Sequence, residues 1–354
     1  HPPAANSAVD GYGFAHAATV SGDQTLPLIA GRAAAGAPFA GRVTLGHAIR
    51  ILTGALLPDG VDTVVLEEDC ATDGTQIAFR GPVKRGANCR AAGEDLAAGD
   101  IAAQAGNWLT PGAVATLAAT GVAEVSVYSR LRVGVLSTGD EIADPGSTDD
   151  PARTYDANRP MLLDLVCGWG MEPVDLGHVG DDRTELAARF DAAAETCDAV
   201  LPSGGASAGD EDHVSALLGE VGTRADWRVA LKPGRPLVLG MWRGTPVFGL
   251  PGNPVAALVC TLVFARPAFG VLRGEGWTSP QAFTLPAAFS KSKKPGRREY
   301  LRARIRDGAA EVFASEGSGR VSSLAWADGL VELPEEAVEI TPGTPVRYLP
   351  ISGF

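Results

Sequence analysis

The chain has 354 residues, 45% of them hydrophobic and 20% charged, which suits about two to four globular domains. Its formal net charge is −12, and this acidity excludes binding of nucleic acid or of an anionic membrane by bulk charge. No apolar run approaches the ~20 residues of a bilayer-spanning helix, so we expect no membrane span.

The five cysteines are odd in number, far apart and without a CxxC pair, which predicts neither a disulfide framework nor a zinc site. This usage favours a reducing, cytoplasmic compartment. The chain begins at His1 rather than Met, so a removed targeting segment stays open at this point.

Residues 7–90 are predicted to form a β-rich domain, because short apolar runs such as Val61–Leu66 and Gln76–Phe79 alternate with turn residues. A linker and small helical domain over residues 91–130 follows. Its helix lies within 108–121, with Thr110 as the expected N-cap, Pro111 at the first helical position and Gly121 at the end.

Strands and helices alternate from residue 131, which predicts a doubly wound α/β domain over residues 131–275. The expected strands are 132–136, 172–176, 199–201, 236–241 and 246–250, and the expected helices are 160–168, 182–194, 212–221 and one from Pro254. Ligands of such sheets sit beyond the carboxyl ends of the strands, where this chain has polar loops after residues 136, 201 and 250. Residues 276–354 are predicted to form a C-terminal β domain, with strands at 283–289, 300–305 and 346–349.

Three loops of the α/β domain carry residue types that suit an anionic ligand. In Leu250–Pro254, Asn253 is a candidate N-cap of the following helix, whose free N–H groups favour anions. An ordinary turn between a strand and a helix explains the same residues. The segment Ser203–Asp210 has three glycines and two serines, so its backbone could close on a ligand or simply be flexible. Lys232–Pro236 sets two cations on a stiff turn, which also suits a solvated basic turn.

Acidic side chains gather in loops, at Asp10, Glu94, Asp95, Asp140, Glu141, Asp181, Asp182, Asp210, Glu211 and Asp212. Most acids in such a chain are solvated or cap helices, and Asp182 has the position of a cap. Those beside the strand ends are candidates for Mg²⁺ ligation, because Mg²⁺ prefers oxygen ligands and phosphate substrates.

Taken together, these segments resemble the molybdopterin molybdenumtransferase family, which contains the MoeA proteins and the E domain of gephyrin. The segments that carry the resemblance are Asn6–Tyr12 (NSAMDGY in the family), Arg50–Ala55 (RIMTGA), Gly93–Asp95 (the end of RRRGED), Leu136–Glu141 (LSTGDE), the loop from Ser203 (SGGVSVGEAD), Lys232–Pro236 (KPGKP), Leu250–Pro254 (LPGNP), Gly296–Tyr300 and Gly317–Arg320. They follow one another in family order.

The resemblance implies an elongated homodimer of four-domain α/β chains, with a MogA-like molybdopterin-binding domain at residues 131–275. Residues 1–6 would join the helical domain, whose usual helical start is absent before His1. The implied reaction takes adenylylated molybdopterin and molybdate, cleaves the pyrophosphate link with Mg²⁺, and releases AMP and molybdenum cofactor. Metal ions and cations suit this chemistry because they neutralise the charge that repels a nucleophile. The expected pathway partner is molybdopterin adenylyltransferase, and molybdate or tungstate stays open as the metal source.

The resemblance also implies roles for individual residues. Molybdate would approach Lys232, Arg235, Arg297 and Ser318. Asp212 would support the Mg²⁺-dependent cleavage, both as a catalytic acid and as a metal ligand. Further functional acids would be Glu141 and Asp181, whereas Asp10, Thr53, Arg90 and Asp95 would come from the other subunit. The remaining substrate contacts would come from Thr138, Ser203, Gly204, Gly205, Ser207, Pro251, Gly252 and Asn253.

The sequence departs from the family pattern at two motifs. Ala91 and Ala92 follow Arg90 where the family has further arginines, and Arg235 replaces the second lysine of KPGKP. Arginine still holds an oxyanion, with a different geometry. Two rival readings stay open: a molybdopterin adenylyltransferase, which shares the 131–275 domain type, and a non-catalytic scaffold or binding paralogue. The extra domains speak against the first, and the retained acids speak against the second.

Overall fold

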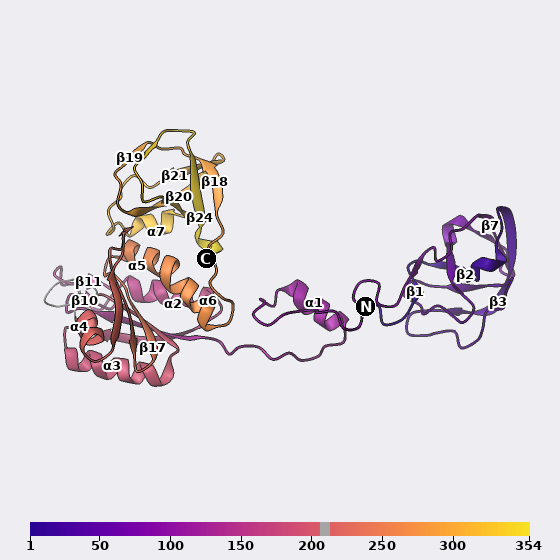
Figure 1. Ribbon diagram of the computed structural model, residues 1–354, viewed down its shortest axis with the longest axis horizontal. Helices are drawn as coiled ribbons and strands as arrows, with labels where there is room; N and C mark the ends of the chain where they lie inside the picture. The colour runs from indigo at the N-terminus through magenta and orange to yellow at the C-terminus, as the bar shows by residue number, and fades with distance from the viewer. Residues whose placement is uncertain (206–212) are drawn as a thin grey trace. The chain divides into compact units, whose positions relative to one another are not determined.

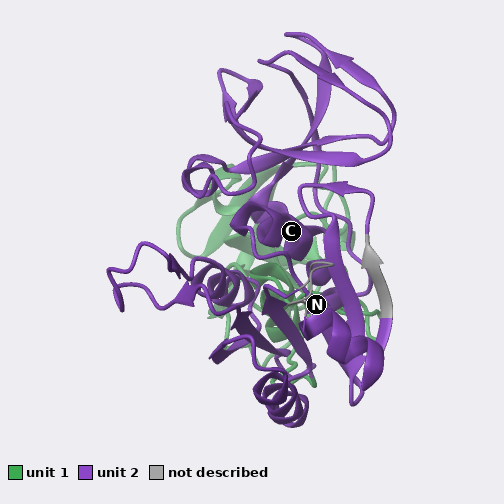
Figure 2. Ribbon diagram, turned by 90° about the vertical axis from the view of Figure 1, so that its left-hand side faces the viewer, with its two compact units in different colours: residues 1–126 green, residues 127–354 purple. Residues whose placement is uncertain are grey.

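The computed structural model describes residues 1–205 and 213–354, and the chain divides into two compact units, residues 1–126 and residues 127–354 (Figure 2). Of residues 225–228 only the backbone is described. Each unit has hydrophobic cores of its own.

The first unit is built on a six-stranded sheet in the order β5-β2-β4-β3-β7-β6. Its strands are β2 (Gly11–Phe14), β3 (Gly22–Ala33), β4 (Ala48–Ile51), β5 (Thr63–Leu66), β6 (Ala71–Thr72) and β7 (Gln76–Gly81), with short 3₁₀ turns at His16–Ala18 and Glu67–Asp69. Phe14 and Phe79 stack in its core with ring centroids 5.2 Å apart. The predicted run at 76–79 lies within β7, and the run at 61–66 contains β5, which begins at Thr63.

A second, two-stranded ribbon pairs β1 (Asn6–Ser7) antiparallel with β8 (Cys89–Arg90). The chain beyond β8 continues along the N-terminal residues, because Gly93 N donates to Pro2 O at 2.9 Å and Asp95 N donates to His1 O at 3.0 Å. The segment that carries Arg90 and Asp95 is therefore held against the first residues of the chain.

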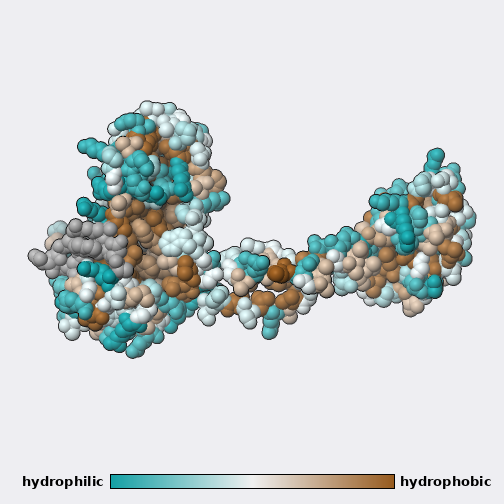
Figure 3. All heavy atoms as spheres, in the orientation of Figure 1, coloured by the Kyte–Doolittle hydropathy of each residue, from teal (hydrophilic) through white to brown (hydrophobic). Residues whose placement is uncertain are grey.

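Helix α1 (Pro111–Ala119) begins as predicted, since the Thr110 hydroxyl accepts from Ala113 N at 3.2 Å and Pro111 is at the first position. No residue of α1 is buried, and Val114 is about half exposed. Apolar side chains accordingly reach the surface around α1 (Figure 3). The division into four domains stays a prediction.

The second unit contains the doubly wound sheet, in the order β12-β9-β13-β17-β16-β14. Its strands are β9 (Arg132–Thr138), β12 (Glu172–Val179), β13 (Ala199–Ser203), β14 (Thr223–Arg228), β16 (Pro236–Trp242) and β17 (Thr245–Gly249). The first four strands of the order are parallel, and β16 and β14 are antiparallel additions at one edge. A small parallel pair, β10 (Ile142–Ala143) and β11 (Thr154–Tyr155), follows β9.

Helices cover both faces of this sheet (Figure 1). On one face lie α2 (Asn158–Gly168) and a long helix made of α5 (Pro254–Cys260), the π-helical turn η3 (Thr261–Ala265) and α6 (Arg266–Leu272). The other face carries α3 (Arg183–Thr196) and α4 (His213–Glu220). The Asp182 carboxylate accepts from Thr184 N and Glu185 N at 2.8 and 3.0 Å, so its predicted capping role is confirmed.

The long helix corrects the expectation that no apolar run approaches the length of a bilayer-spanning helix. Pro254–Leu272 has 19 residues with a mean hydropathy of 2.0, so by length and composition it could cross a membrane. Arg266 and Pro267 interrupt the apolar run in the sequence, which is why it looked too short. In the structure 67% of it is buried within the protein, as in the core helix of a folded domain.

The C-terminal part of this unit is a sheet in the order β15-β20-β22-β24-β18, with β21 added to β20. Its elements are β15 (Leu231–Lys232), β18 (Phe283–Pro286), β20 (Arg298–Arg306), β21 (Ala309–Val312), β22 (Gly329–Leu333) and β24 (Pro345–Pro350), with the pair β19 (Lys291–Lys293) and β23 (Val338–Ile340), helix α7 (Ser322–Trp326) and a 3₁₀ turn at Ile351–Gly353. Strand β15 comes from the α/β part of the sequence and pairs with β20, placing Lys232 opposite Glu299. Tyr300, Leu330 and Leu349 join the core of the α/β part, so the two parts pack together.

Candidate functional site

The carboxyl ends of β13 and β17 meet, and they are joined by backbone hydrogen bonds and by one buried side chain. Ser203 bridges to Leu250, and Gly204 N donates to Leu250 O at 3.1 Å. At the start of α2, Asn158 Nδ2 donates to Ser203 Oγ at 2.6 Å and to Gly252 O at 2.8 Å. Asn158 is only 7% exposed, so one side chain that is shielded from water bonds both loops.

Sequence reasoning missed Asn158 because it started this helix at Pro160. A signal was available, since Asn158, Leu162 and Val166 are spaced by four residues and all three are buried. The buried face of the helix thus extends back to a polar residue, and a buried amide needs hydrogen-bond partners.

Gly204 brings a third loop into contact. Its φ is +99°, and a Cβ added there would lie 2.5 Å from Thr138 O. A Cβ at Gly252 would lie 3.9 Å from Gly204 Cα. Only glycine allows both the conformation and the approach, and the Thr138 hydroxyl also donates to Ser203 O at 3.4 Å. The predicted residues Thr138, Ser203, Gly204 and Gly252 therefore contact one another in sequence at the carboxyl edge of the sheet, and we call these four residues the floor.

Acidic side chains border this floor at the ends of β9 and β12. Asp140 N donates to Asp181 Oδ2 at 3.2 Å, and Asp181 N donates to Asp140 Oδ1 at 3.0 Å. The Glu141 carboxylate folds back over Gly139, where an added Cβ would lie 2.4 Å from Glu141 Oε2. The structure thus joins Asp140 to Asp181, and Glu141 follows Asp140 directly in the chain. The candidate residues Ser207, Asp210, Glu211 and Asp212 lie outside the described residues.

Within residues 1–205 and 213–354, no group of three His, Cys, Asp or Glu side chains is placed to hold a metal ion. Mg²⁺ commonly uses only one or two carboxylates and takes its other ligands from phosphate oxygens and water. Asp140 and Asp181 each use one carboxylate oxygen for a backbone N–H in these bonds, so each could offer the other.

The turn Leu250–Pro254 starts the long helix, with Pro254 at the first position as predicted. Asn253 stands at the N-cap, but the expectation that its side chain caps the helix was wrong. Instead, Ser318 O accepts from Val255 N at 3.3 Å, so a carbonyl from the C-terminal part satisfies this free helix N–H. This bond brings the loop of Ser318 against the turn.

Lys232 lies in a four-membered ion-pair cluster, which we call the lysine–glutamate cluster: Lys232, Lys291, Glu299 and Glu316. Lys232 Nζ lies 3.4 Å from Glu299 Oε1 and 2.7 Å from Glu316 Oε2. Lys291 Nζ lies 3.2 Å from Glu299 Oε2 and also contacts Glu316 Oε1. The hydrogen bond that Lys232 Nζ donates to Glu316 raises the pKa of Lys232, and the same bond lowers the pKa of Glu316.

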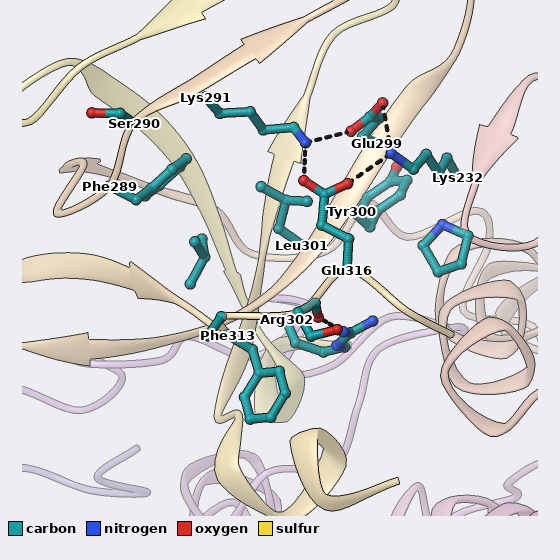
Figure 4. A pocket seen from close by; sticks show the side chains of 14 residues that line it. Lys232, Phe289, Ser290, Lys291, Glu299, Tyr300, Leu301, Arg302, Phe313 and Glu316 are labelled. Atoms are coloured by element: carbon teal, nitrogen blue, oxygen red, sulfur yellow. Dashed lines mark hydrogen bonds and ion pairs between the residues drawn. The ribbon is translucent and has the colours of Figure 1, made fainter. Parts of the chain in front are cut away.

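The cluster lines a cavity of about 160 Å³ between β15, β19, β20 and the loop after β21 (Figure 4). Apolar side chains such as Phe289 and Leu301 form another part of its wall. Sequence reasoning found Lys232 but missed its three partners. They come from segments 59 to 84 residues away in the sequence, and the pairing of β15 with β20 brings Glu299 opposite Lys232.

The other two predicted cations, Arg235 and Arg297, are exposed and make no ion pair with any described residue. Between Lys232 and Arg235, Gly234 has a φ of +111°, and a Cβ there would lie 2.4 Å from Cys260 Sγ. The turn is therefore packed tightly on α5, which fixes the backbone from which both cations project.

In the first unit, Asp10 Oδ1 accepts from Thr53 N at 2.6 Å and from the Thr53 hydroxyl at 2.7 Å. The backbone hydrogen bond from Thr53, followed by that of its hydroxyl, lowers the pKa of Asp10. Gly54 N donates to Ser7 O, and Ser7 belongs to the ribbon that contains Arg90. Asp10 and Thr53 are thus in direct contact, and both are exposed together with Arg90 and Asp95.

Three family models match the chain. Residues 1–121 match the MoeA N-terminal region (domain I and II), residues 134–270 match a model described as "Probable molybdopterin binding domain", and residues 284–351 match the MoeA C-terminal region (domain IV).

Named relatives agree with these models. The chain is 36% identical to the molybdopterin molybdenumtransferase of Haemophilus influenzae, over 98% of this chain and 87% of the relative. It is also 36% identical to molybdopterin molybdenumtransferase 2 of Mycobacterium tuberculosis, over 84% and 76%. A crystal structure of the molybdopterin biosynthesis MoeA protein of Pyrococcus horikosii matches with a TM-score of 0.85 and 30% identity, covering 100% of this chain and 89% of that one. The chain therefore belongs to the MoeA family.

Proposed function

We propose that the protein inserts molybdenum from molybdate into adenylylated molybdopterin, with Mg²⁺-dependent release of AMP. The names of its relatives support this activity. The observation that carries the proposal is the shared floor of Thr138, Ser203, Gly204 and Gly252, at the carboxyl ends of parallel strands where such sheets bind ligands.

The residues suit the two substrates in different ways. Gly204 and Gly252 place backbone without side chains beside Thr138 and Ser203, and such backbone can approach a pterin or its phosphates closely. Cations suit molybdate, which is a dianion, and Lys232, Arg235, Arg297 and Ser318 are proposed to hold it. The chain from Glu316 to Ser318 links Lys232 to the turn that borders the floor.

Cleavage of the pyrophosphate link needs its charge neutralised where that charge grows in the transition state. A bound Mg²⁺ would supply this charge. Asp212 is proposed to act as acid and metal ligand in this step, together with Glu141 and Asp181, which follow the ends of β9 and β12. Asp10, Thr53, Arg90 and Asp95 are proposed to complete the site from the second subunit of a homodimer.

The direct test incubates the protein with adenylylated molybdopterin and Mg²⁺, with and without molybdate, and measures AMP. We expect AMP release only when molybdate is present. ATP-dependent adenylylation of molybdopterin would support an adenylyltransferase instead, and binding without turnover would support a scaffold. Asp212→Ser should still bind the adenylylated pterin but release no AMP, whereas Asp164→Ser, an exposed acid on α2, should behave as the unmodified protein.

A further inference from the structure

The lysine–glutamate cluster has the arrangement of an oxyanion site whose ligand position is filled by the protein itself. Glu316 places one carboxylate oxygen on each ammonium group, Oε2 on Lys232 and Oε1 on Lys291 (Figure 4). A tetrahedral oxyanion presents two oxygens along one edge, much as a carboxylate does. An oxyanion could therefore take the place of the Glu316 carboxylate without moving either lysine.

The four members of the cluster differ in how firmly they are held. The side chains of Lys291 and Glu299 are 12% and 10% exposed, and both residues lie on strands. Glu299 also contacts both ammonium groups, so it would keep them in place when Glu316 leaves. The Glu316 side chain is 46% exposed and belongs to the irregular loop between β21 and α7. Glu316 is thus the member that can be exchanged at least cost.

The charge of the cluster points the same way. With Glu316 in place, two ammonium groups face two carboxylates and the cluster is neutral. Without it, the two cations outnumber the one buried carboxylate, which favours an anion in the vacated position. Phe289 and Leu301 in the wall of the cavity reduce the competition from water.

We propose that Lys291 is a second cation of the molybdate site beside Lys232, and that Glu316 is an intramolecular competitor that occupies this site until the oxyanion displaces it. This inference rests on the proposed function for the identity of the oxyanion. The loop that carries Glu316 also carries Ser318, whose carbonyl bonds the start of the long helix. Displacement of Glu316 by molybdate would therefore be transmitted through this loop to the turn Leu250–Pro254.

The test measures molybdate binding directly, by equilibrium dialysis with sulfate as the competing probe, in the full chain without pterin. Lys291→Met should weaken molybdate binding by at least about tenfold, because one charge-assisted contact is lost. Lys291→Arg should recover part of that loss. Glu316→Gln should have the opposite effect and tighten binding, since the competing carboxylate is gone.

Two exposed residues serve as matched controls for the change in net charge. Lys294→Met and Glu336→Gln alter the same charges outside the cluster and should leave binding unchanged. Thermal melting of each variant separates loss of binding from loss of folding. A merely structural role of Glu316 would predict weaker binding in Glu316→Gln, and that result would overturn the competitor assignment.

The same variants separate this inference from the proposed function. If molybdate-dependent AMP release persists but Lys291→Met and Glu316→Gln leave the required molybdate concentration unchanged, the inference fails while the function stands. If the variants shift molybdate binding in opposite directions but no AMP is released by the unmodified protein, the oxyanion site stands and the function fails.

Discussion

One buried amide is hydrogen-bonded to both loops of the candidate pterin floor. Asn158 joins the loops after β13 and β17 through hydrogen bonds to Ser203 and Gly252, while its own carbonyl oxygen is buried without a described partner. A buried amide that donates to two acceptors stabilises the fold. Without this amide, both acceptors stay buried and lose a hydrogen-bond donor.

We expect Asn158→Ala to lower the free energy of unfolding by about 1–3 kcal/mol. Ser203→Ala should cost less, because the bond from Asn158 to Gly252 survives. Since the two side chains share one bond, the double variant should lose less than the sum of the single losses, which urea denaturation can measure. Strictly additive losses would show that this bond does not hold the loops.

The Asp10–Thr53 contact predicts a pH effect. The pKa of Asp10 is lowered below 3.8 in the folded protein, chiefly by the backbone N–H of Thr53 and then by its hydroxyl. Stability from these bonds is therefore fully present above the unfolded pKa and is lost as the pH falls through the folded one. Thr53→Val should move the pKa of Asp10 part of the way back, because the backbone bond remains.

Carboxyl-detected NMR titration can follow this change. Asp73, whose pKa is lowered to about 2 by bonds from Thr75 and Gln76, is an internal control in the same unit and should not move. An unaltered Asp10 titration in Thr53→Val would show that the hydroxyl bond does not form in solution.

At the scale of single residues, motif reasoning located the floor residues and Lys232 but not Asn158, Lys291, Glu299 or Glu316. The first group sits in loops whose composition is visible in the sequence itself. The second group acquires its role only through strand register and helix packing, as in the pairing of Lys232 with Glu299.

Among the elements, the close approach of the loop after β13 to Thr138 predicts that a side chain at Gly204 lowers the stability of the fold. Gly204 and Gly244 both have positive φ, +99° and +88°, but only at Gly204 does an added Cβ meet backbone, at Thr138 O. Gly244 has open space around it. Alanine at Gly244 should therefore cost only the conformational strain, about 1–3 kcal/mol.

Gly204→Ala should lower the free energy of unfolding by that strain and by a steric contribution of similar size, because Thr138 must shift. Chemical denaturation of Gly204→Ala and Gly244→Ala gives the difference between them. Equal losses of stability would mean that the two loops do not touch as described.

Strand and helix positions followed well from apolar patterns where an element is long and buried, as for β9, β13 and α3. Short or polar elements escaped prediction. Strand β15 has two residues before a proline, and β14 runs through the largely polar residues 223–228 at a sheet edge. Such strands form because a neighbouring strand offers hydrogen bonds, which local sequence does not encode.

For the whole molecule, the proposed homodimer makes a complementation prediction. Asp10 lies in the first unit, whereas Asp212 belongs to the sequence of the second and falls outside the described residues. If each active site takes one residue from each subunit, a heterodimer of Asp10→Ala and Asp212→Ala has one site with both lesions and one intact site. Random mixing makes about half of the dimers mixed, so roughly a quarter of the unmodified activity should return.

This experiment requires that each variant is inactive alone and that heterodimers are shown to form after co-expression. Sites contained within one chain would each keep a lesion, and no AMP would then be released. Continued inactivity in verified heterodimers would therefore rule out shared sites while leaving the chemistry itself untouched.

The protein is proposed to insert molybdenum into the pterin, and the most direct measurement detects the resulting molybdenum cofactor. The protein is incubated with adenylylated molybdopterin, Mg²⁺ and molybdate, and the mixture is added to a molybdenum enzyme prepared without its cofactor. We predict recovery of that enzyme's activity in step with AMP release, and none when molybdate or the protein is omitted. AMP release that is independent of molybdate, or that yields no active cofactor, would contradict the assignment.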